Sequence, residues 1–420
     1  MRKRYDLAQL NWTLSGWMPE LWRVEQSMEI GASPNAEVAA IPAAVPGSVQ
    51  MSLLKAGLIP DWNIGLNHRA CEWVENRHWV YETTIPQDWI QAGQKVRLNC
   101  RGLDYRGTIL VNKTEVGTFE GSLAPHVFDL TNHLAETANK LRIVFDLPPR
   151  WLGQYGYTSR MREWKARFNY TWDWVPRLVQ TGISESIYLE VTDGKEITEL
   201  RCVTDLDLET GGELKINGKV NGASVEISLK RDGGTLRKET LAAEQFNSNG
   251  ILWDRLDVDK WWPNLCGDQP LYDVDVVLLD KAGTAIDSAT RRVGFRNVSW
   301  RHCEGGEHAD PWICVVNGRP VFLQGINWTP IRPNYADVTE ADYRKRLELY
   351  KDLGLNIMRV WGGAFLERER FYNLCDELGL LVWQEFPLSS SGVENYPPDD
   401  SDAIESMLPI VKSYIQRRQH

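Results

Sequence analysis

The chain has 420 residues, 43% hydrophobic and 25% charged, which is typical of a soluble protein with more than one domain, because a single core stops growing at about 250–300 residues. Its net charge of -10 argues against nucleic acid and anionic membrane as partners, since both are bound by basic surfaces. The 19 tryptophans are unusual; their flat apolar rings suit the C–H faces of sugars, although most are expected to pack inside the protein.

The first 193 residues are predicted to form a jelly-roll-like β-sandwich. Short alternating or apolar runs recur there at even spacing between turn residues, a pattern typical of sandwiches and jelly rolls. The predicted strands are His78–Ile85, Lys95–Cys100, Thr108–Asn112, Leu141–Phe145 and Ser186–Val191.

Residues 194–297 are predicted to form a second, immunoglobulin-like sandwich. The alternation of apolar and polar residues is cleaner here, and about 100 residues is the usual size of such a domain. The predicted strands are Glu199–Val203, Glu213–Asn217, Ser224–Leu229 and Leu271–Leu278.

Residues 298–420 change to a strand–helix alternation. Strands are predicted at Val321–Trp328, Asn356–Trp361 and Leu380–Phe386, and helices from the Thr339 cap to Leu353, from Glu367 to Leu378 and from Asp402 to about Arg418. Strands that are apolar on both faces predict a parallel sheet. We interpret this region as the first three βα units of an incomplete TIM (β/α)8 barrel, since eight units need about 250 residues. A small open α/β domain is the alternative.

The sequence shows no sign of a metal site or a cofactor. The seven cysteines are scattered, without CxxC spacing, and are expected to be reduced and mostly buried. The seven histidines lack ligand spacing, and there is no glycine-rich phosphate loop and no GxSxG motif. With neither an apolar signal segment nor a membrane-length apolar stretch, a cytoplasmic protein is expected. The oligomeric state is not predicted.

Several motifs, in a shared order, resemble the β-mannosidase branch of glycoside hydrolase family two. They are Val45–Gln50, Leu54–Pro60 and Trp73–Tyr81; Gly102–Asp104, Val111–Asn112 and Val116–Gly117; Trp261–Asn264, Gln269–Tyr272 and Arg291–Arg296; and Gly325–Trp328, Arg359–Gly363 and Trp383–Phe386. The succession of sandwich, immunoglobulin-like sandwich and barrel start is also similar to the layout of that family.

The resemblance implies a retaining exo-β-mannosidase that removes terminal β-D-mannose from the non-reducing end of a glycan. In the family, a glutamate acid/base follows an asparagine at the end of the fourth barrel strand, and a glutamate nucleophile ends the seventh. Both are expected beyond His420, so we expect no catalytic carboxylate in this chain and no activity from it alone. The alternatives are a family-two enzyme for a β-galactoside, β-glucuronide or β-glucosaminide, and a non-catalytic carbohydrate-binding protein.

The segment Thr171–Arg177 is the first candidate substrate-binding element. By resemblance, Asp173 contacts the sugar from a loop that reaches the barrel mouth, flanked by Trp172 and Trp174. A carboxylate can accept hydrogen bonds from two sugar hydroxyls. The alternative is an inter-domain packing hairpin, and Val175 stands where the branch usually has glycine.

The ends of the three predicted barrel strands supply the other candidates, because barrels of this kind place their sites there. By resemblance, Arg359 orients the nucleophilic carboxylate, and Trp361 lines the pocket and favours mannose. An ion pair to a neighbouring strand is the alternative for Arg359. Asn327 and Glu385 occupy equivalent strand ends, where each could bind the sugar or brace neighbouring loops.

Overall fold

A computed structural model describes residues 1–24, 35–153, 156–389 and 391–418. In it, the first part of the chain is a sandwich of antiparallel sheets. One sheet has the order β1 (Lys3–Asp6), β13 (Ile187–Thr192), β6 (Lys95–Cys100) and β10 (His126–Asp129). The other has the order β3 (Val38–Pro42), β2 (Thr13–Trp17), β5 (His78–Ile85), β11 (Asn139–Phe145), β8 (Arg106–Val111) and β9 (Thr114–Glu120).

Shorter elements complete this first sandwich. A small sheet joins β4 (Gly47–Ser48), β12 (Gly182–Ile183) and β7 (Leu103–Asp104), and the α-helices are α1 (Leu21–Val24) and α2 (Val49–Lys55). Short 3-10 segments are η1 (Leu7–Gln9), η2 (Asn67–Asn76), η3 (Gln87–Trp89), η5 (Thr158–Arg160) and η6 (Phe168–Tyr170). The apolar faces of both sheets close on one core that includes Leu98, Ile143 and Leu189.

The second sandwich has the three-plus-four strand arrangement expected of an immunoglobulin-like domain. Its sheets are β14 (Ile197–Asp207), β15 (Gly211–Val220) and β18 (Ile251–Leu256), and β17 (Gly234–Ala242), β16 (Ser224–Arg231), β19 (Tyr272–Leu279) and β20 (Ala285–Val293), with α3 (Ala243–Asn249) at one end. Because apolar and polar residues alternate along the strands, one face of each sheet turns inward. In β19, Tyr272, Val274, Val276 and Leu278 are all buried in the core of this sandwich.

The third part begins with the hairpin sheet β21 (Val298–Arg301), β22 (Ile313–Val316) and β23 (Arg319–Pro320), which the sequence did not predict. A three-stranded sheet follows, made of β24 (Gly325–Trp328), β25 (Ile357–Val360) and β26 (Leu381–Gln384), with α4 (Glu340–Asp352), α5 (Glu369–Leu378), α6 (Ser401–Arg418) and the 3-10 turn η7 (Tyr335–Asp337). The strands pair in parallel, as predicted. The fold class of two sandwiches and a barrel start is therefore confirmed.

Local signals placed most of the helix ends. Thr339 caps α4, accepting a hydrogen bond from the Asp342 backbone N–H at 3.2 Å while the Asp342 carboxylate accepts from the Thr339 N–H at 2.9 Å. Gly379 ends α5 in the left-handed conformation, with a φ of 75°.

In the third part, two predicted starts were wrong by two residues or more. The strand expected from Val321 begins at Gly325, because the Asn356 side chain bonds the Phe322 carbonyl and the Gln324 N–H in place of a partner strand. The helix expected from Glu367 begins at Glu369, because the Glu367 carboxylate is instead buried against the rest of the third part.

Buried polar contacts fix the first sandwich against the third part of the chain. The fully buried Asp104 carboxylate accepts hydrogen bonds from the Lys165 ammonium, from Gln180 Nε2 at 3.1 Å and from the Tyr335 hydroxyl at 2.8 Å. Tyr335 belongs to η7, after β24. Burial lowers the pKa of Lys165, so its charge depends on the carboxylate beside it.

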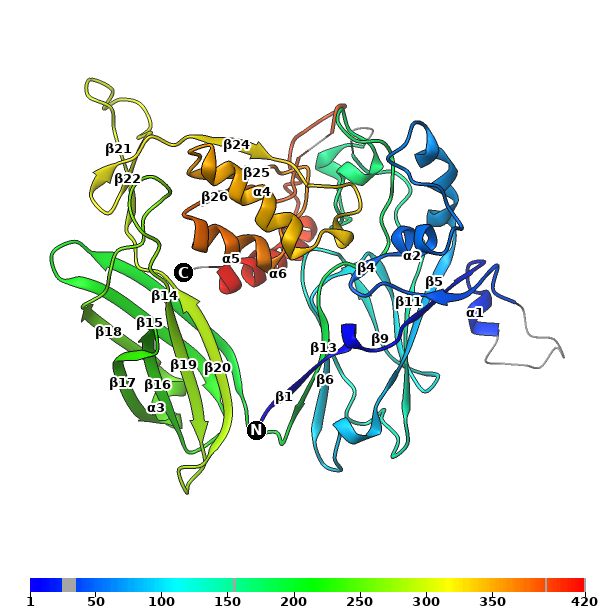
Figure 1. The fold of residues 1–420 in the computed structure, drawn as a ribbon, viewed down its shortest axis with the longest axis horizontal. Coiled ribbons are helices and arrows are strands. Elements are labelled where there is room, and N and C mark those ends of the chain that lie inside the picture. Colours follow the sequence, from blue (N-terminus) through cyan, green and yellow to red (C-terminus); the bar gives the residue numbers. More distant parts are fainter. Residues whose placement is uncertain (25–34, 154–155, 390, 419–420) are drawn as a thin grey trace.

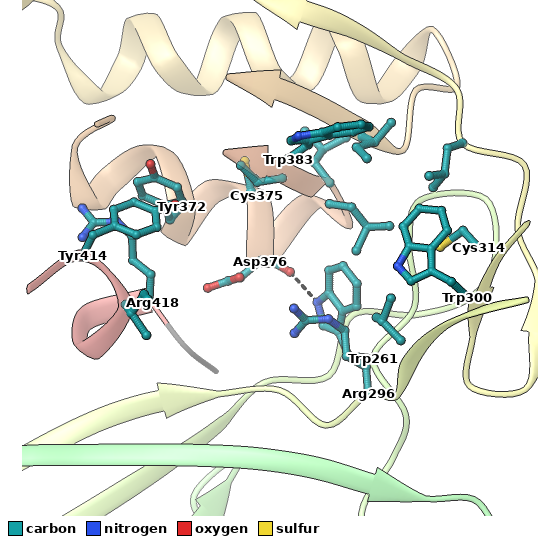
Figure 2. Close-up of a pocket in the computed structure, with 17 residues that line it drawn as sticks. Trp261, Arg296, Trp300, Cys314, Tyr372, Cys375, Asp376, Trp383, Tyr414 and Arg418 are labelled. Carbon is teal, nitrogen blue, oxygen red and sulfur yellow. Dashed lines mark hydrogen bonds between the residues drawn. The ribbon is translucent and has the colours of Figure 1, made fainter. Parts of the chain in front are cut away.

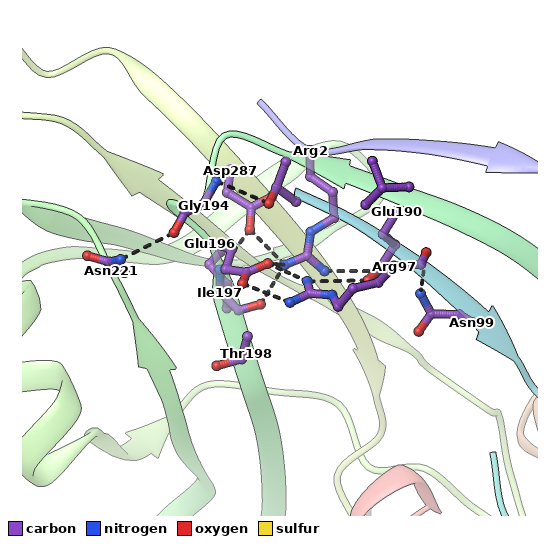
Figure 3. Close-up of polar contacts among 12 residues, drawn as sticks. Arg2, Arg97, Asn99, Glu190, Gly194, Glu196, Ile197, Thr198, Asn221 and Asp287 are labelled. Atoms are coloured by element: carbon purple, nitrogen blue, oxygen red, sulfur yellow. Dashed lines mark hydrogen bonds and ion pairs between the residues drawn. The ribbon is translucent and has the colours of Figure 1, made fainter. Parts of the chain in front are cut away.

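The two sandwiches lie side by side, joined by an arginine–carboxylate cluster (Figure 1; Figure 3). Arg2 donates to the buried Asp287 carboxylate of the second sandwich at 2.9 Å, and Arg97 Nη1 donates to Glu196 at 2.8 Å. The second sandwich also contacts the third part, where Trp261 Nε1 donates to the Asp376 carbonyl at 2.8 Å. No helix among the described residues is long and apolar enough to cross a membrane.

Replacing Asp104 by alanine should lower the free energy of unfolding by about 3–5 kcal/mol, because the Lys165 ammonium stays buried without its carboxylate. Urea titration followed by tryptophan fluorescence measures the change. The control is Asp259→Ala, which removes a surface pair with Arg231 and should cost less than about 1 kcal/mol. A similarly small loss in both variants would contradict the proposed anchoring role of Asp104.

Candidate functional site

The carboxyl ends of the three parallel strands bring Asn327, Arg359 and Glu385 together. Asn327 and Arg359 are register partners in β24 and β25, and Glu385 directly follows β26. Arg359 Nε donates to Glu385 Oε1 at 2.6 Å, Nη2 lies 2.6 Å from the same oxygen, and Nη1 donates to Asn327 Oδ1 at 2.9 Å. The Arg359 side chain is 37% exposed, so the guanidinium is held by neighbouring strands while part of it still faces solvent.

The second oxygen of Glu385 holds the turn that follows β25. Glu385 Oε2 accepts a hydrogen bond from the Gly362 backbone N–H at 3.0 Å. A Cβ atom at position 362 would lie 3.1 Å from that oxygen and 3.0 Å from Ser389 Oγ, so the turn packs closely on the loop after β26. Gly362 lies in the motif Arg359–Gly363, but the sequence alone does not predict this role for it.

Trp361 in this turn meets Trp172 of the first sandwich. Their ring centroids are 5.6 Å apart and the planes are tilted by 46°. Trp172 lies in a tight turn closed by its N–H bond to the Val175 carbonyl at 3.1 Å. The segment Thr171–Arg177 therefore packs between domains near the ends of the barrel strands, while the sugar contact expected of Asp173 stays a prediction.

Asp173 stands exposed at the tip of this turn. Within the described part of the chain, its carboxylate forms no hydrogen bond and no ion pair. Trp174 beside it is 39% exposed and stacks on Phe168 with a centroid distance of 5.6 Å. Val175 is buried in the apolar cluster that also contains Phe168 and Ala364, so its side chain fills the domain contact.

A buried arginine ties the loop after β26 to the first sandwich. Arg167 donates to the Ser389 carbonyl at 2.8 Å, to Ser391 Oγ at 2.7 Å and to Thr158 Oγ1 at 2.9 Å. Burial lowers the pKa of Arg167 to about 10. Its role had not been predicted, because a loop-to-loop contact leaves no periodic signal in the sequence.

Another feature of the structure is a cavity of about 590 Å³ (Figure 2). It borders β26, the outermost strand of the parallel sheet, and is lined from both faces of that strand, by Leu380 to Trp383, and by α5, α6 and the hairpin sheet. Its lining is mainly apolar, and it contains none of the candidate sugar-binding residues.

The described residues contain no cluster of three or more His, Cys, Asp or Glu side chains suited to a metal ion, and all seven cysteines are free.

Three family models match the chain in succession. They are the glycosyl hydrolase 2 galactose-binding domain-like model over residues 22–185, the glycosyl hydrolases family 2 model over residues 195–296 and the family 2 TIM barrel domain over residues 311–419. With the two docked sandwiches and the polar cluster at the strand ends, they define a multidomain glycoside hydrolase fold built on a barrel. The chain belongs to glycosyl hydrolases family 2.

Named relatives narrow the similarity within the family. β-Mannosidase B from Emericella nidulans is 29% identical over 384 residues, which covers 86% of this chain and 45% of the relative. The crystal structure of a β-D-mannosidase from Dictyoglomus thermophilum matches with a TM-score of 0.81 and 25% identity, over 99% of this chain and 50% of that one. An exo-chitosanase from Amycolatopsis orientalis, at 17% identity, a TM-score of 0.71 and coverage of 99% and 48%, shows the fold alone. The chain spans about half the length of these proteins.

The Trp172–Trp361 contact should appear as an energetic coupling between the first sandwich and the third part of the chain. In a double-mutant cycle with Trp172→Ala and Trp361→Ala, the two losses in unfolding free energy should differ from additivity by about 0.5–1.5 kcal/mol. Urea unfolding provides the four values. Trp172→Ala combined with Trp300→Ala, in the hairpin sheet, is the control and should be additive within about 0.5 kcal/mol. Additivity in both cycles would show that the ring contact contributes nothing.

Proposed function

We propose that this chain is the sugar-recognising part of a retaining exo-β-mannosidase that releases terminal β-D-mannose from the non-reducing end of a glycan. The observation that carries the proposal is the contact between Trp172 and Trp361, which brings the Asp173 turn beside the Arg359 cluster. The β-mannosidase relatives, which match most of the chain, support mannose as the sugar.

Each group at the site has a chemical task in this proposal. Asp173 accepts hydrogen bonds from sugar hydroxyls, and such charge-assisted bonds are about twice as strong as neutral ones. Trp172 and Trp361 offer apolar ring faces to the C–H side of the sugar. Arg359 keeps two N–H groups beyond those bound to Glu385 and Asn327, and these can orient a nucleophilic carboxylate and hold it ionised.

The cleavage step needs two carboxyl groups about 5–5.5 Å apart, one as acid/base and one as nucleophile. The family resemblance assigns them to glutamates that end the fourth and seventh barrel strands, whereas β24, β25 and β26 correspond to the first three. Glu385 ends the third strand and is bonded to Arg359 and Gly362, so we assign it neither of these roles.

The 420-residue chain alone should not hydrolyse an aryl β-mannoside, whereas a longer protein that contains it and the remaining barrel strands should. Release of the aryl group is followed for β-mannoside, β-galactoside, β-glucuronide and β-glucosaminide substrates. Preference for another sugar would replace mannose in the proposal. Binding of sugars without any turnover by the longer protein would favour a non-catalytic carbohydrate-binding role, and turnover by this chain alone would contradict the assignment of the catalytic glutamates.

In that longer protein, Asp173→Asn should lower kcat/KM for the β-mannoside by about 10- to 100-fold, because hydrogen bonds to a charged group are worth about 1.5–3 kcal/mol each. Its unfolding midpoint should not change, since Asp173 makes no polar contact with any described residue. Asp310→Asn, at another exposed position, is the matched control and should leave kcat/KM unchanged. Equal activity of the two variants would remove Asp173 from the site.

A further inference from the structure

We infer that Glu385 is a positioning residue that sets two groups of the candidate site at once, the Arg359 guanidinium and the Trp361 ring, and does not itself bind the sugar. This inference rests on the proposed function for its meaning. The geometry behind it does not involve a substrate. It concerns only how the Glu385 carboxylate links the end of β25 to the turn that follows.

The two oxygens of Glu385 are divided between two neighbours. Oε1 lies 2.6 Å from both Nε and Nη2 of Arg359, and Oε2 accepts a hydrogen bond from the Gly362 backbone N–H at 3.0 Å. The Glu385 backbone is fixed as well, since its N–H donates to the Val360 carbonyl at 3.1 Å and extends the β25–β26 pairing. These contacts use three of the roughly four acceptor sites of a carboxylate, so Glu385 has little capacity left for a sugar hydroxyl.

The bond to Gly362 transmits this restraint to Trp361. The turn is compact, because the Ala364 N–H donates to the Trp361 carbonyl at 3.1 Å, and the missing side chain at Gly362 allows the close approach of Glu385 and Ser389. The Trp361 side chain extends from this turn and contacts the Trp172 ring. If the Oε2 bond is lost, the turn can rotate and the Trp361 ring loses its fixed angle to Trp172.

The restraint on Arg359 is direct. Asn327 and Glu385 hold the guanidinium from the two flanking strands, which fixes its plane and leaves two N–H groups without a bond to either residue. Without Glu385, only the Asn327 bond at 2.9 Å would remain among the described contacts of this guanidinium. A single carboxylate therefore makes the positions of the arginine and the indole depend on one another.

Circular dichroism of the 420-residue chain tests the effect on the indole. Two indoles this close produce an exciton couplet, and the difference between the spectra of the parent and Trp361→Phe isolates the contribution of the Trp172–Trp361 pair. We expect Glu385→Ala to lose at least half of this contribution. Glu385→Gln, which keeps an acceptor for the Gly362 N–H, should retain most of it and also covers the case in which the alanine variant does not fold.

Chemical labelling tests the effect on the arginine. Modification of Arg359 by phenylglyoxal, measured by peptide mass spectrometry, should become at least threefold faster in both Glu385 variants. The matched control is Glu377→Ala. It removes a carboxylate of similar side-chain exposure (33%, against 29% for Glu385) that forms ion pairs with Arg292 and Arg344. It should leave the couplet and the Arg359 labelling rate unchanged.

In a folded Glu385→Ala variant, an unchanged couplet or an unchanged Arg359 labelling rate would overturn the inference. Where that variant does not fold, an unchanged Arg359 labelling rate in Glu385→Gln would overturn it. Equal changes in the Glu377 control would also overturn it, because the effect would then be general destabilisation. Neither measurement uses a substrate, so failure of the longer protein to cleave β-mannosides would refute the proposed function and leave this result standing.

Discussion

The candidate site depends on the requirement that a charge buried in a protein interior must have a partner. Asp104 and Lys165 are both fully buried in the first sandwich, and the Tyr335 hydroxyl that completes the hydrogen bonding of Asp104 comes from the third part of the chain. The neighbouring Gln180 side chain accepts from the Ala336 N–H at 2.8 Å. Asp104 and Gln180 therefore complete their hydrogen bonding only in the docked position of the sandwich, which also sets the Trp172 turn against the strand ends.

Arg368 extends the same principle to the helix layer. It is buried and donates to the Tyr335 carbonyl in η7, to the Val338 carbonyl just after η7 at 2.9 Å, and to the Ser184 carbonyl of the first sandwich at 3.4 Å. Arg167 does the equivalent for the loop after β26. Guanidinium groups suit this work because five N–H donors in one plane can satisfy several loop carbonyls at once. Loops that lack regular pairing thus become fixed walls of the site.

The fold was more predictable from the sequence than the site. Strand β5 begins and ends where its alternating run does, and Thr339 and Gly379 mark helix ends by local chemistry that does not depend on the rest of the chain. The prediction failed at Val321, because an apolar run cannot show that the Asn356 side chain will take the backbone bonds of residues 322–324.

The strand-end residues could be predicted as a group but their partners could not. Parallel strands end at one edge, so Asn327, Arg359 and Glu385 had to be near one another. That Glu385 would divide its oxygens between Arg359 and Gly362 depends on rotamers and on the height of each strand, which one sequence does not specify. The links made by Arg167 and Arg368 join residues far apart in the chain, and a single sequence carries no pattern for such pairs.

Three carboxylates near the strand ends show how environment divides roles among chemically equivalent groups. Glu367 is fully buried, and burial raises its pKa even though Trp328 Nε1 at 2.8 Å and the Tyr343 hydroxyl at 2.6 Å donate to it, so it belongs to the packing of the helix layer. Glu385 is half-buried and bonded through both oxygens, to Arg359 and to Gly362, so its charge serves to hold other groups. Asp173 is exposed and unpartnered among the described residues, so its hydrogen-bonding capacity is still available. A ligand hydroxyl gains most from an acceptor whose bonds are not already made, and of these three carboxylates Asp173 has the most hydrogen-bonding capacity left for a ligand.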